Sequence, residues 1–182
     1  KRKLKTAYSV LEEYINSLVQ NRKSINVSDV GAGSKVFKSN SREIAKIAIT
    51  AGISSKRAEL LFRITHYFQP ESILEFGTSL GMATSALSLG NPTAKISTLE
   101  GCPETAKIAQ NQFRQFGLSN VNLVTTEFRN YLENNQLSII NYQLIYFDGN
   151  HSKKATLDYF ELLLPTITNE TVWIFDDIHW SY

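Results

Sequence analysis

The sequence has one cysteine, Cys102, and one methionine among its 182 residues. A single cysteine excludes an intrachain disulfide and a cysteine-rich metal site. Long hydrophobic runs of membrane-spanning length are missing, and no signal-peptide pattern opens the chain. A large excess of charge of one sign is also missing, because the formal net charge is only +2. We therefore expect a cytoplasmic protein that binds neither nucleic acid nor a membrane.

The amino-acid composition is typical of a globular protein. Hydrophobic residues make up 42% of the chain and charged residues 20%. That composition and length are enough for one substantial core. The chain begins at Lys1 without a methionine, so we expect it to be part of a longer protein.

Residues 1–70 predict a helical extension packed on the rest of the molecule. Apolar side chains recur at helical spacing over 6–20, a second helix is expected from an N-cap at Ser41 to Gly52, and a third over 55–67. The polar stretch between the first two contains Gly31-Ala32-Gly33-Ser34, which looks like a nucleotide-binding loop. No β-branched run precedes it and no strand ending in an acid follows, so we interpret it as a loop, or alternatively as a flap over a site.

Strand-like and helix-like segments alternate over residues 71–182, which we take as the second part of the chain. This alternation predicts a doubly wound, Rossmann-like α/β fold with a mostly parallel sheet and helices on both faces. Ligands of such sheets bind beyond the carboxyl ends of the strands. The expected strands are 72–76, 95–99, 120–125, 142–148 and 171–176, and the expected helices are 82–90, 103–116, 128–135 and 153–164.

The first of these strands ends in an acid, and two glycines four positions apart follow before the next helix. Glycine is needed there if the backbone takes unusual dihedral angles or a ligand approaches closely. The N–H groups at the start of the helix then face that ligand. An alternative is that the acid is simply satisfied by N–H groups of the loop. The expected cofactor-binding residues here are Glu75, Gly77, Thr78, Ser79 and Gly81.

The second strand is followed by Glu100 and Gly101, and the third by Glu127. A carboxylate at the position of Glu100 can accept hydrogen bonds from both hydroxyls of a ribose. Its alternative role is that of an acid at the start of the helix that contains Pro103. Residues around Glu127 are expected to meet an adenine.

Three acids follow the last two strands: Asp148 after the fourth, and Asp176 and Asp177 after the fifth. Together they would form an all-oxygen site, which suits Mg²⁺, Ca²⁺ or Mn²⁺. The alternatives are that Asp148 caps a helix and that Asp177 is merely exposed. His151 is a candidate general base at the mouth of this cleft, although a histidine there can equally be a surface residue, as can His179.

Residues from about 70 to 180 resemble class I S-adenosylmethionine-dependent methyltransferases. Within that class they are most similar to the cation-dependent O-methyltransferases of the catechol and caffeoyl-CoA type and to related small bacterial enzymes. The first motif has the form E-x-G-x-x-x-G, with Ser79 where the broader motif has a middle glycine. The resemblance is carried by 74–81, Glu100, 145–151 and 174–180.

The resemblance implies S-adenosylmethionine as the cofactor, with Glu75, Gly77, Gly81 and Glu100 around its methionine and ribose parts. It implies that Asp148, which also borders the cofactor and the reacting atoms, joins Asp176 and Asp177 as ligands of a divalent cation. In the family the last ligand is usually Asn, so Asp177 is a departure. His151 falls where catechol-type enzymes have a lysine base.

The expected function is O-methylation of a small hydroxylated molecule, and the expected assembly is a homodimer. One alternative is a protein of the same fold that binds S-adenosylmethionine or a partner without chemistry. A nicotinamide-dinucleotide oxidoreductase is the other, but it predicts a G-x-G-x-x-G spacing that Gly77 and Gly81 do not have. The family normally continues past the fifth strand, so we expect a further segment after Tyr182.

Overall fold

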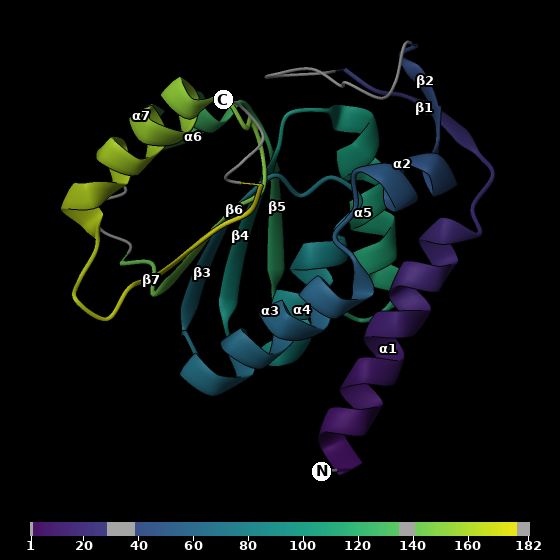
Figure 1. Ribbon diagram of the computed structural model, residues 1–182, viewed down its shortest axis with the longest axis horizontal. Coiled ribbons are helices and arrows are strands. Elements are labelled where there is room, and N and C mark those ends of the chain that lie inside the picture. Colours follow the sequence, from purple (N-terminus) through teal and green to yellow (C-terminus); the bar gives the residue numbers. More distant parts are fainter. Residues whose placement is uncertain (1, 29–38, 135–140, 178–182) are drawn as a thin grey trace.

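A five-stranded parallel sheet lies at the centre of the protein, in the order β5-β4-β3-β6-β7 (Figure 1). The structure is a computed structural model that describes residues 2–28, 39–134 and 141–177. The order reverses between β3 and β6, so the crevice between their carboxyl ends is the expected ligand position. The strands are β3 (Ser72–Phe76), β4 (Lys95–Glu100), β5 (Val121–Thr125), β6 (Leu144–Phe147) and β7 (Val172–Phe175).

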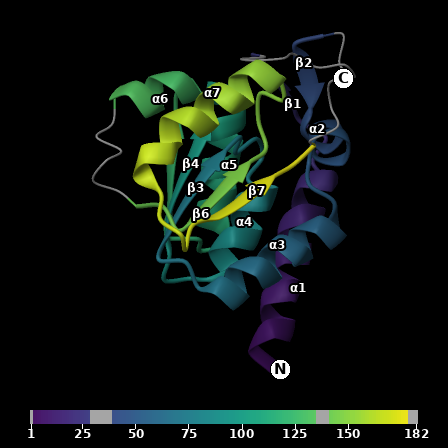
Figure 2. The same cartoon turned by 60° about the vertical axis from the view of Figure 1, so that its left-hand side comes forward.

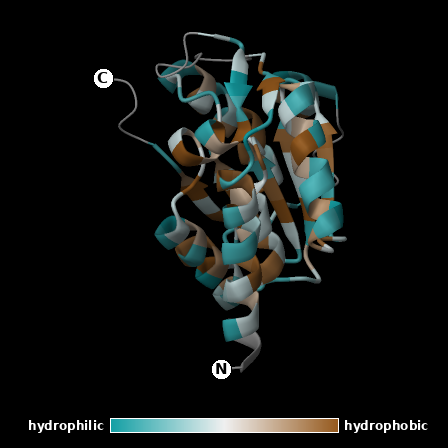
Figure 3. Cartoon of the chain, turned by 90° about the vertical axis from the view of Figure 1, so that its right-hand side faces the viewer, coloured by the Kyte–Doolittle hydropathy of each residue, from teal (hydrophilic) through white to brown (hydrophobic). Residues whose placement is uncertain are grey.

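Helices cover both faces of the sheet (Figure 2). On one face lie α4 (Met82–Gly90) and α5 (Pro103–Gln115), and on the other α6 (Phe128–Asn134) and α7 (Lys153–Leu163), which ends in the 3₁₀ turn Leu164–Thr166. Strand side chains alternate between the faces: Ile73 joins the first cluster, and Leu74 and Phe76 join the second. In Figure 3 the strands are accordingly among the most hydrophobic segments. The predicted α/β fold with a parallel sheet is confirmed.

The N-terminal helices form an outer layer against α4. They are α1 (Arg2–Val19), α2 (Ile44–Thr50) and α3 (Ser55–Phe68). Buried residues of α1, such as Leu11 and Leu18, belong to the same hydrophobic cluster as Leu87 of α4 and Ile73 of the sheet. Since α4 lies between this layer and the sheet, nearly all its residues are buried. The division of the chain at residue 70 stays a prediction.

The stretch expected to be a polar loop contains a short antiparallel pair, β1 (Ser24–Asn26) and β2 (Ser41–Glu43). The predicted N-cap at Ser41 is therefore wrong. Ser41 pairs with Asn26 in the sheet, and α2 begins only after Glu43, whose side chain makes no capping bond. Helix α1 also starts earlier than expected, at Arg2. The segment Gly31–Ser34 lies outside the described residues.

The described helices include none that is both long enough and apolar enough to cross a membrane.

Candidate functional site

The connection from β3 to α4 is held against the neighbouring strand ends. The N–H groups of Gly77 and Thr78 both donate to the carbonyl oxygen of Leu99, at 3.0 Å each. Gly77 has φ +99°, and a Cβ there would lie 2.3 Å from the carbonyl oxygen of Asp148. Glycine is thus required because the loop after β6 approaches the backbone, as well as for its dihedral angles.

The rest of this loop also has unusual backbone conformations. Ser79 has φ +47°, which is uncommon for a residue with a side chain, and its N–H donates to Glu100 Oε2 at 2.7 Å. Gly81 has φ +77°, and a Cβ there would meet the ring of Phe113 and the hydroxyl of Tyr14 at 2.5 Å each. The second glycine therefore faces the packed helices, whereas the first faces the loop after β6.

Glu75 is completely buried at the end of β3. Its Oε2 atom accepts hydrogen bonds from the hydroxyls of Thr84 and Thr98, at 2.5 Å each, and Thr78 contacts Thr98 at 2.6 Å. The strand register explains part of this arrangement, because Glu75 of β3 is paired with Thr98 of β4. Among the described residues, threonine hydroxyls bind this acid, and the alternative that N–H groups of the loop satisfy it is not found.

The other oxygen of this carboxyl group, Glu75 Oε1, is buried and has no hydrogen-bond partner among the described residues. Burial raises the pKa of Glu75 from 4.5 to about 7, and the charge of Glu100 adds to the rise, while the hydrogen bonds from Thr84 and Thr98 oppose it. An unpaired buried oxygen of this kind is rare in folded proteins and is suited to a hydrogen-bond donor from a ligand.

Glu100, at the end of β4, links the glycine loop to the start of α5. Its Oε2 accepts from Ser79 N–H, and its Oε1 accepts from Cys102 N–H at 2.8 Å. Burial raises the pKa of Glu100, although these backbone N–H groups act in the opposite direction. Each oxygen has a second lone pair, so the half-buried carboxylate can still accept bonds from a ligand. The role at a helix start and a role in binding are therefore compatible.

Two further predicted positions lie beside Glu100. Gly101 directly follows it, and the N–H of Thr126 donates to the carbonyl oxygen of Glu100 at 2.9 Å. Glu127 comes next and is exposed. The three predicted strand-end segments thus converge at one edge of the sheet.

A pocket opens above the glycine loop. Its volume is about 10 Å³, so it admits only a small part of a ligand. The connection between α2 and α3 forms the wall opposite the loop. The lining residues are Ala51, Gly52, Ile53, Gly77, Thr78, Ser79, Leu80, Met82, Ala83 and Asp148.

The acids after β6 and β7 lie next to each other because the strands are in register. The N–H of Asp148 donates to Phe76 O, and that of Asp176 donates to Phe147 O, both at 2.9 Å. The hydroxyl of Tyr146 lies 3.3 Å from Asp148 Oδ2 and 3.1 Å from Asp176 Oδ2. Burial and the charge of Asp176 raise the pKa of Asp148.

The expected metal site at these acids is not confirmed. Among the residues that the structure describes, no group of three His, Cys, Asp or Glu side chains is arranged to hold a metal ion. At β7, the Arg57 guanidinium of α3 lies 3.1 Å from Asp176 Oδ1 and 3.6 Å from Asp177 Oδ1. The predicted ligands Asp148, Asp176 and Asp177 are therefore joined by a phenol and a guanidinium.

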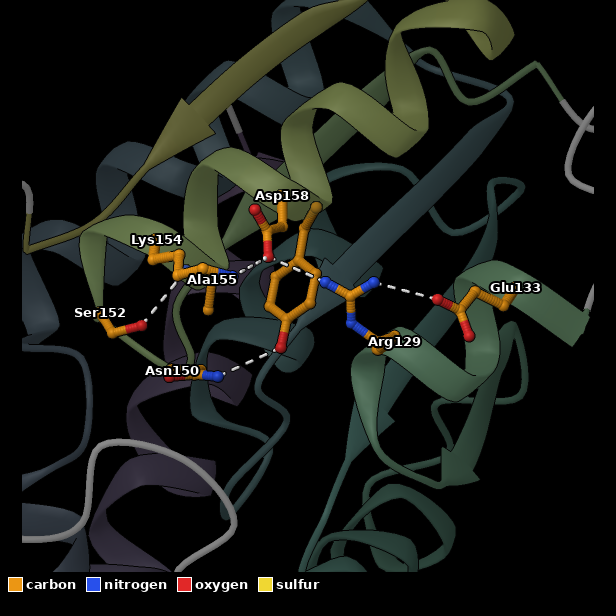
Figure 4. A network of polar contacts seen from close by, with 8 residues as sticks. Arg129, Glu133, Asn150, Ser152, Lys154, Ala155 and Asp158 are labelled. Atoms are coloured by element: carbon orange, nitrogen blue, oxygen red, sulfur yellow. Dashed lines mark hydrogen bonds and ion pairs between the residues drawn. The ribbon is translucent and has the colours of Figure 1, made fainter.

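His151 lies in the loop between β6 and α7, and His179 lies outside the described residues. The loop is fixed on both sides of His151 (Figure 4). Asn150, with φ +48°, donates to the Tyr159 hydroxyl at 3.1 Å, and Ser152 caps α7 by accepting from Ala155 N–H. The predicted alternative of Asp148 as the cap is thereby excluded, since Ser152 fills that role.

A salt-bridge network anchors the same region from outside. Arg129 of α6 lies 2.8 Å from Asp158 of α7 and 3.0 Å from Glu133, and Lys154 also contacts Asp158, at 3.2 Å (Figure 4). These pairs are exposed, so each contributes little to stability. They nevertheless tie α6 to the first turns of α7, directly after the loop that contains His151.

The contacts of three residues of the site, Tyr14, Arg57 and Tyr146, were not predicted from the sequence. Tyr146 had a signal, because it precedes Asp148 by two positions and so points to the same face of the sheet. Tyr14 and Arg57 had none: their partners are Leu80 and Asp176, which lie 66 and 119 residues further along the chain.

Solved structures of several methyltransferases share this fold. A Podospora anserina methyltransferase, PaMTH1, is 19% identical with a TM-score of 0.70, and the match covers 92% of this chain and 62% of that one. An O-methyltransferase from Bacillus cereus is 22% identical with a TM-score of 0.67, covering 92% and 65%. The chain spans less than two thirds of either protein.

A third similar structure is a putative caffeoyl-CoA O-methyltransferase from Staphylococcus aureus, 18% identical with a TM-score of 0.65, covering 75% of this chain and 64% of that one. No curated protein matches the sequence. The family model described as a methyltransferase domain matches residues 74–178, from the end of β3 to just beyond the acids after β7. Because that match includes more than half of the chain and every strand end of the site, the protein belongs to this methyltransferase family.

Proposed function

We propose that the protein transfers a methyl group from S-adenosylmethionine to a hydroxyl oxygen of a small acceptor. The observation that carries the proposal is the unpaired Oε1 atom of Glu75, buried at the switch point of the sheet beside the glycine loop. The ammonium group of a bound amino acid would supply the missing donor and would favour the ionised carboxylate.

The remaining residues fit the other parts of this cofactor. Glu100 has lone pairs for the hydroxyls of a ribose, and Gly77, Thr78 and Ser79 line the pocket. Two similar structures support the choice, since the Podospora anserina and Bacillus cereus proteins are described as bound to S-adenosylhomocysteine. The small pocket volume suits one end of the molecule, with the rest along the open strand ends.

The cofactor would supply a methyl group already bonded to a positively charged sulfur, which is both electrophile and leaving group. The task of the protein is then mainly to align the acceptor oxygen with that carbon, which can contribute roughly 7–11 kcal/mol. Asp148 lines the pocket. His151, three residues further along, is the proposed acceptor of the hydroxyl proton.

Oxygen is the proposed methyl acceptor because a neutral hydroxyl needs a base, and this edge of the sheet carries Asp148, Asp176 and His151. The Bacillus cereus and Staphylococcus aureus structures are described as O-methyltransferases, the latter as a putative caffeoyl-CoA enzyme. The proposed substrate class is accordingly a small hydroxylated molecule.

A binding experiment tests the cofactor. We expect calorimetry on the full-length protein to detect S-adenosylhomocysteine but not NADH. Glu100→Gln should weaken that binding at least about tenfold, because charge-assisted bonds are worth roughly 1.5–3 kcal/mol. Glu104→Gln is the matched control, since Glu104 is exposed on the next helix. NADH binding without S-adenosylhomocysteine binding, or equal losses in the two variants, would overturn the cofactor assignment.

An activity assay then tests the transfer. S-adenosylhomocysteine formation should appear with acceptors that carry hydroxyl groups, and it should be absent when the same acceptors carry methoxy groups instead. Turnover of amines alone would contradict O-methylation. Cofactor binding without turnover on any acceptor would favour a non-catalytic binding protein.

A further inference from the structure

We propose that Arg57 provides the fixed positive charge at the acid cluster after β6 and β7, in the place where a divalent cation would bind. The cluster consists of Asp148, Asp176 and Asp177. The assignment of Arg57 depends only on the contacts around these acids, and its meaning for catalysis rests on the proposed methyl transfer.

The hydrogen bonds that Asp176 already accepts leave little room for a metal ion at its carboxylate. Its Oδ1 accepts from the Arg57 guanidinium at 3.1 Å and from the N–H of Asp177 at 2.9 Å. Its Oδ2 accepts from the Tyr146 hydroxyl at 3.1 Å. Oδ1 therefore already accepts two hydrogen bonds from donors of the chain, and Oδ2 accepts one.

One guanidinium nitrogen serves both neighbouring acids. The Nη1 atom of Arg57 lies 3.1 Å from Asp176 Oδ1 and 3.6 Å from Asp177 Oδ1. A Mg²⁺ or Mn²⁺ ion on the same two oxygens would have to sit roughly 2.0–2.2 Å from each of them. Because an ion and a guanidinium of like charge cannot share these oxygens, the two compete for one position.

The backbone that presents Arg57 is well anchored. Arg57 lies in the first turn of α3, where its N–H is capped by the Ser54 hydroxyl at 3.4 Å. The neighbouring residues Ala58, Leu61 and Phe62 are buried against the rest of the molecule. The helix therefore sets the position of this arginine, while 59% of the side chain remains exposed at the rim of the cluster.

The chemistry of arginine suits this role. A guanidinium stays charged at all physiological pH values, and its donors match carboxylate oxygens. Two adjacent acids at a strand end require such a partner, since an unpaired carboxylate is costly when partly buried. In the proposed reaction, the acceptor proton then passes to a side chain of the protein with no divalent cation involved.

A Mn²⁺ titration of the full-length protein, followed by the electron paramagnetic resonance of free Mn²⁺, tests this competition. The wild-type protein is expected to bind no Mn²⁺ at concentrations up to about 1 mM, a range that covers ordinary protein sites for divalent ions. Arg57→Gln is expected to gain Mn²⁺ affinity at least about tenfold, because two carboxylates lose their counter-charge. Adding Asp176→Asn to that variant should abolish the gain.

Two further variants complete the experiment. Arg63→Gln is the matched control on the same helix, because Arg63 pairs only with Glu59, at 3.7 Å, among the described residues, and it should behave as wild type. Arg57→Lys keeps a cation and should still exclude Mn²⁺, which covers the case in which Arg57→Gln does not fold.

The results distinguish a failure of the role of Arg57 from a failure of the proposed function. Wild-type binding of Mn²⁺ at or below about 1 mM, or equal behaviour of Arg57→Gln and Arg63→Gln, would overturn the role of Arg57. The titration contains no cofactor. Failure of the wild-type protein to bind S-adenosylhomocysteine would therefore count against the proposed function and not against the role of Arg57.

Discussion

The hydroxyl of Tyr14 lies 2.9 Å from the carbonyl oxygen of Leu80, and both residues are buried. Tyr14 belongs to the N-terminal helix α1, whereas Leu80 lies in the glycine loop between Ser79 and Gly81. The bond therefore fixes the conformation of a proposed cofactor loop from outside the sheet. Burial raises the pKa of Tyr14, so its hydroxyl stays protonated and remains a donor.

Tyr14→Phe should loosen the glycine loop without altering the packing of the ring. Leaving the Leu80 carbonyl unpaired is expected to cost about 1–3 kcal/mol of unfolding free energy. We also expect weaker S-adenosylhomocysteine binding, measured by calorimetry, because Ser79 and Glu100 lose their support. Tyr8→Phe is the control, since Tyr8 lies on the same helix and packs its ring against Phe62. Unchanged affinity in Tyr14→Phe would show that the loop needs no such support.

Glu75 should make the stability of the ligand-free protein depend on pH. Its pKa is raised from 4.5 to about 7, so the folded chain keeps a proton that the unfolded chain loses in that interval. The contribution of Glu75 to stability is therefore greatest below pH 4.5 and declines as the pH rises towards about 7. The shift corresponds to about 3 kcal/mol. Urea unfolding of wild type and Glu75→Gln at pH 5 and pH 8 measures this contribution. The loss of stability between the two pH values that is absent in Glu75→Gln belongs to Glu75, and the loss that remains belongs to other groups such as Asp148.

The same carboxyl group predicts a proton release on binding. If an ammonium group meets Glu75 Oε1, the ionised carboxylate is favoured and the proton leaves. Calorimetry near pH 6.5 in buffers of different ionisation enthalpy should then detect it with wild type but not with Glu75→Gln. A proton release that persists in Glu75→Gln would place the titrating group elsewhere.

Gly77→Ala should disrupt the meeting of the loops after β3 and β6. A Cβ at Gly77 would lie 2.3 Å from the carbonyl oxygen of Asp148, in a conformation with φ +99°. Together these effects should cost about 3 kcal/mol or more. Gly117→Ala is the matched control, because Gly117 has φ +67° but no atom lies within 4 Å of its added Cβ. Equal losses of melting temperature would mean that the dihedral angle alone matters.

His151→Gln should slow methyl transfer and leave cofactor binding unchanged. A positioned base typically contributes 10²–10⁴-fold, so kcat is expected to drop by about 10²-fold or more. The control is His66→Gln, since His66 lies on α3 and contacts the carbonyl oxygen of Gly90 at 3.3 Å. An unchanged kcat in His151→Gln would assign the proton to another acceptor.

The strands and helices of the sheet were predictable because their signals are local. The helix expected over 82–90 is found at Met82–Gly90, and each strand ends within one residue of its expected end. Once strand ends are known, a parallel sheet places Glu75, Glu100 and Asp148 at one edge. This is why the convergence of these residues could be predicted from their positions, while their binding of a cofactor stays a prediction.

The details that depend on distant partners could not be predicted. The β1–β2 pair has only three residues in each strand, too few for a recognisable alternation. The ion pair of Arg57 with Asp176 depends on how α3 crosses the end of β7, and no local pattern encodes that crossing. Likewise, the threonine hydroxyls that bind Glu75 follow from strand register and helix packing rather than from any motif.

The burial of α4 between the sheet and the helices α1 and α3 has a practical consequence for protein engineering. A fragment that starts at residue 71 would keep the whole family match but strip one side of α4, where Leu87 and Ala86 are completely buried in the intact chain. Freshly uncovered apolar surface of this kind promotes self-association. Shortened versions for assays or crystallisation should therefore retain the first helix.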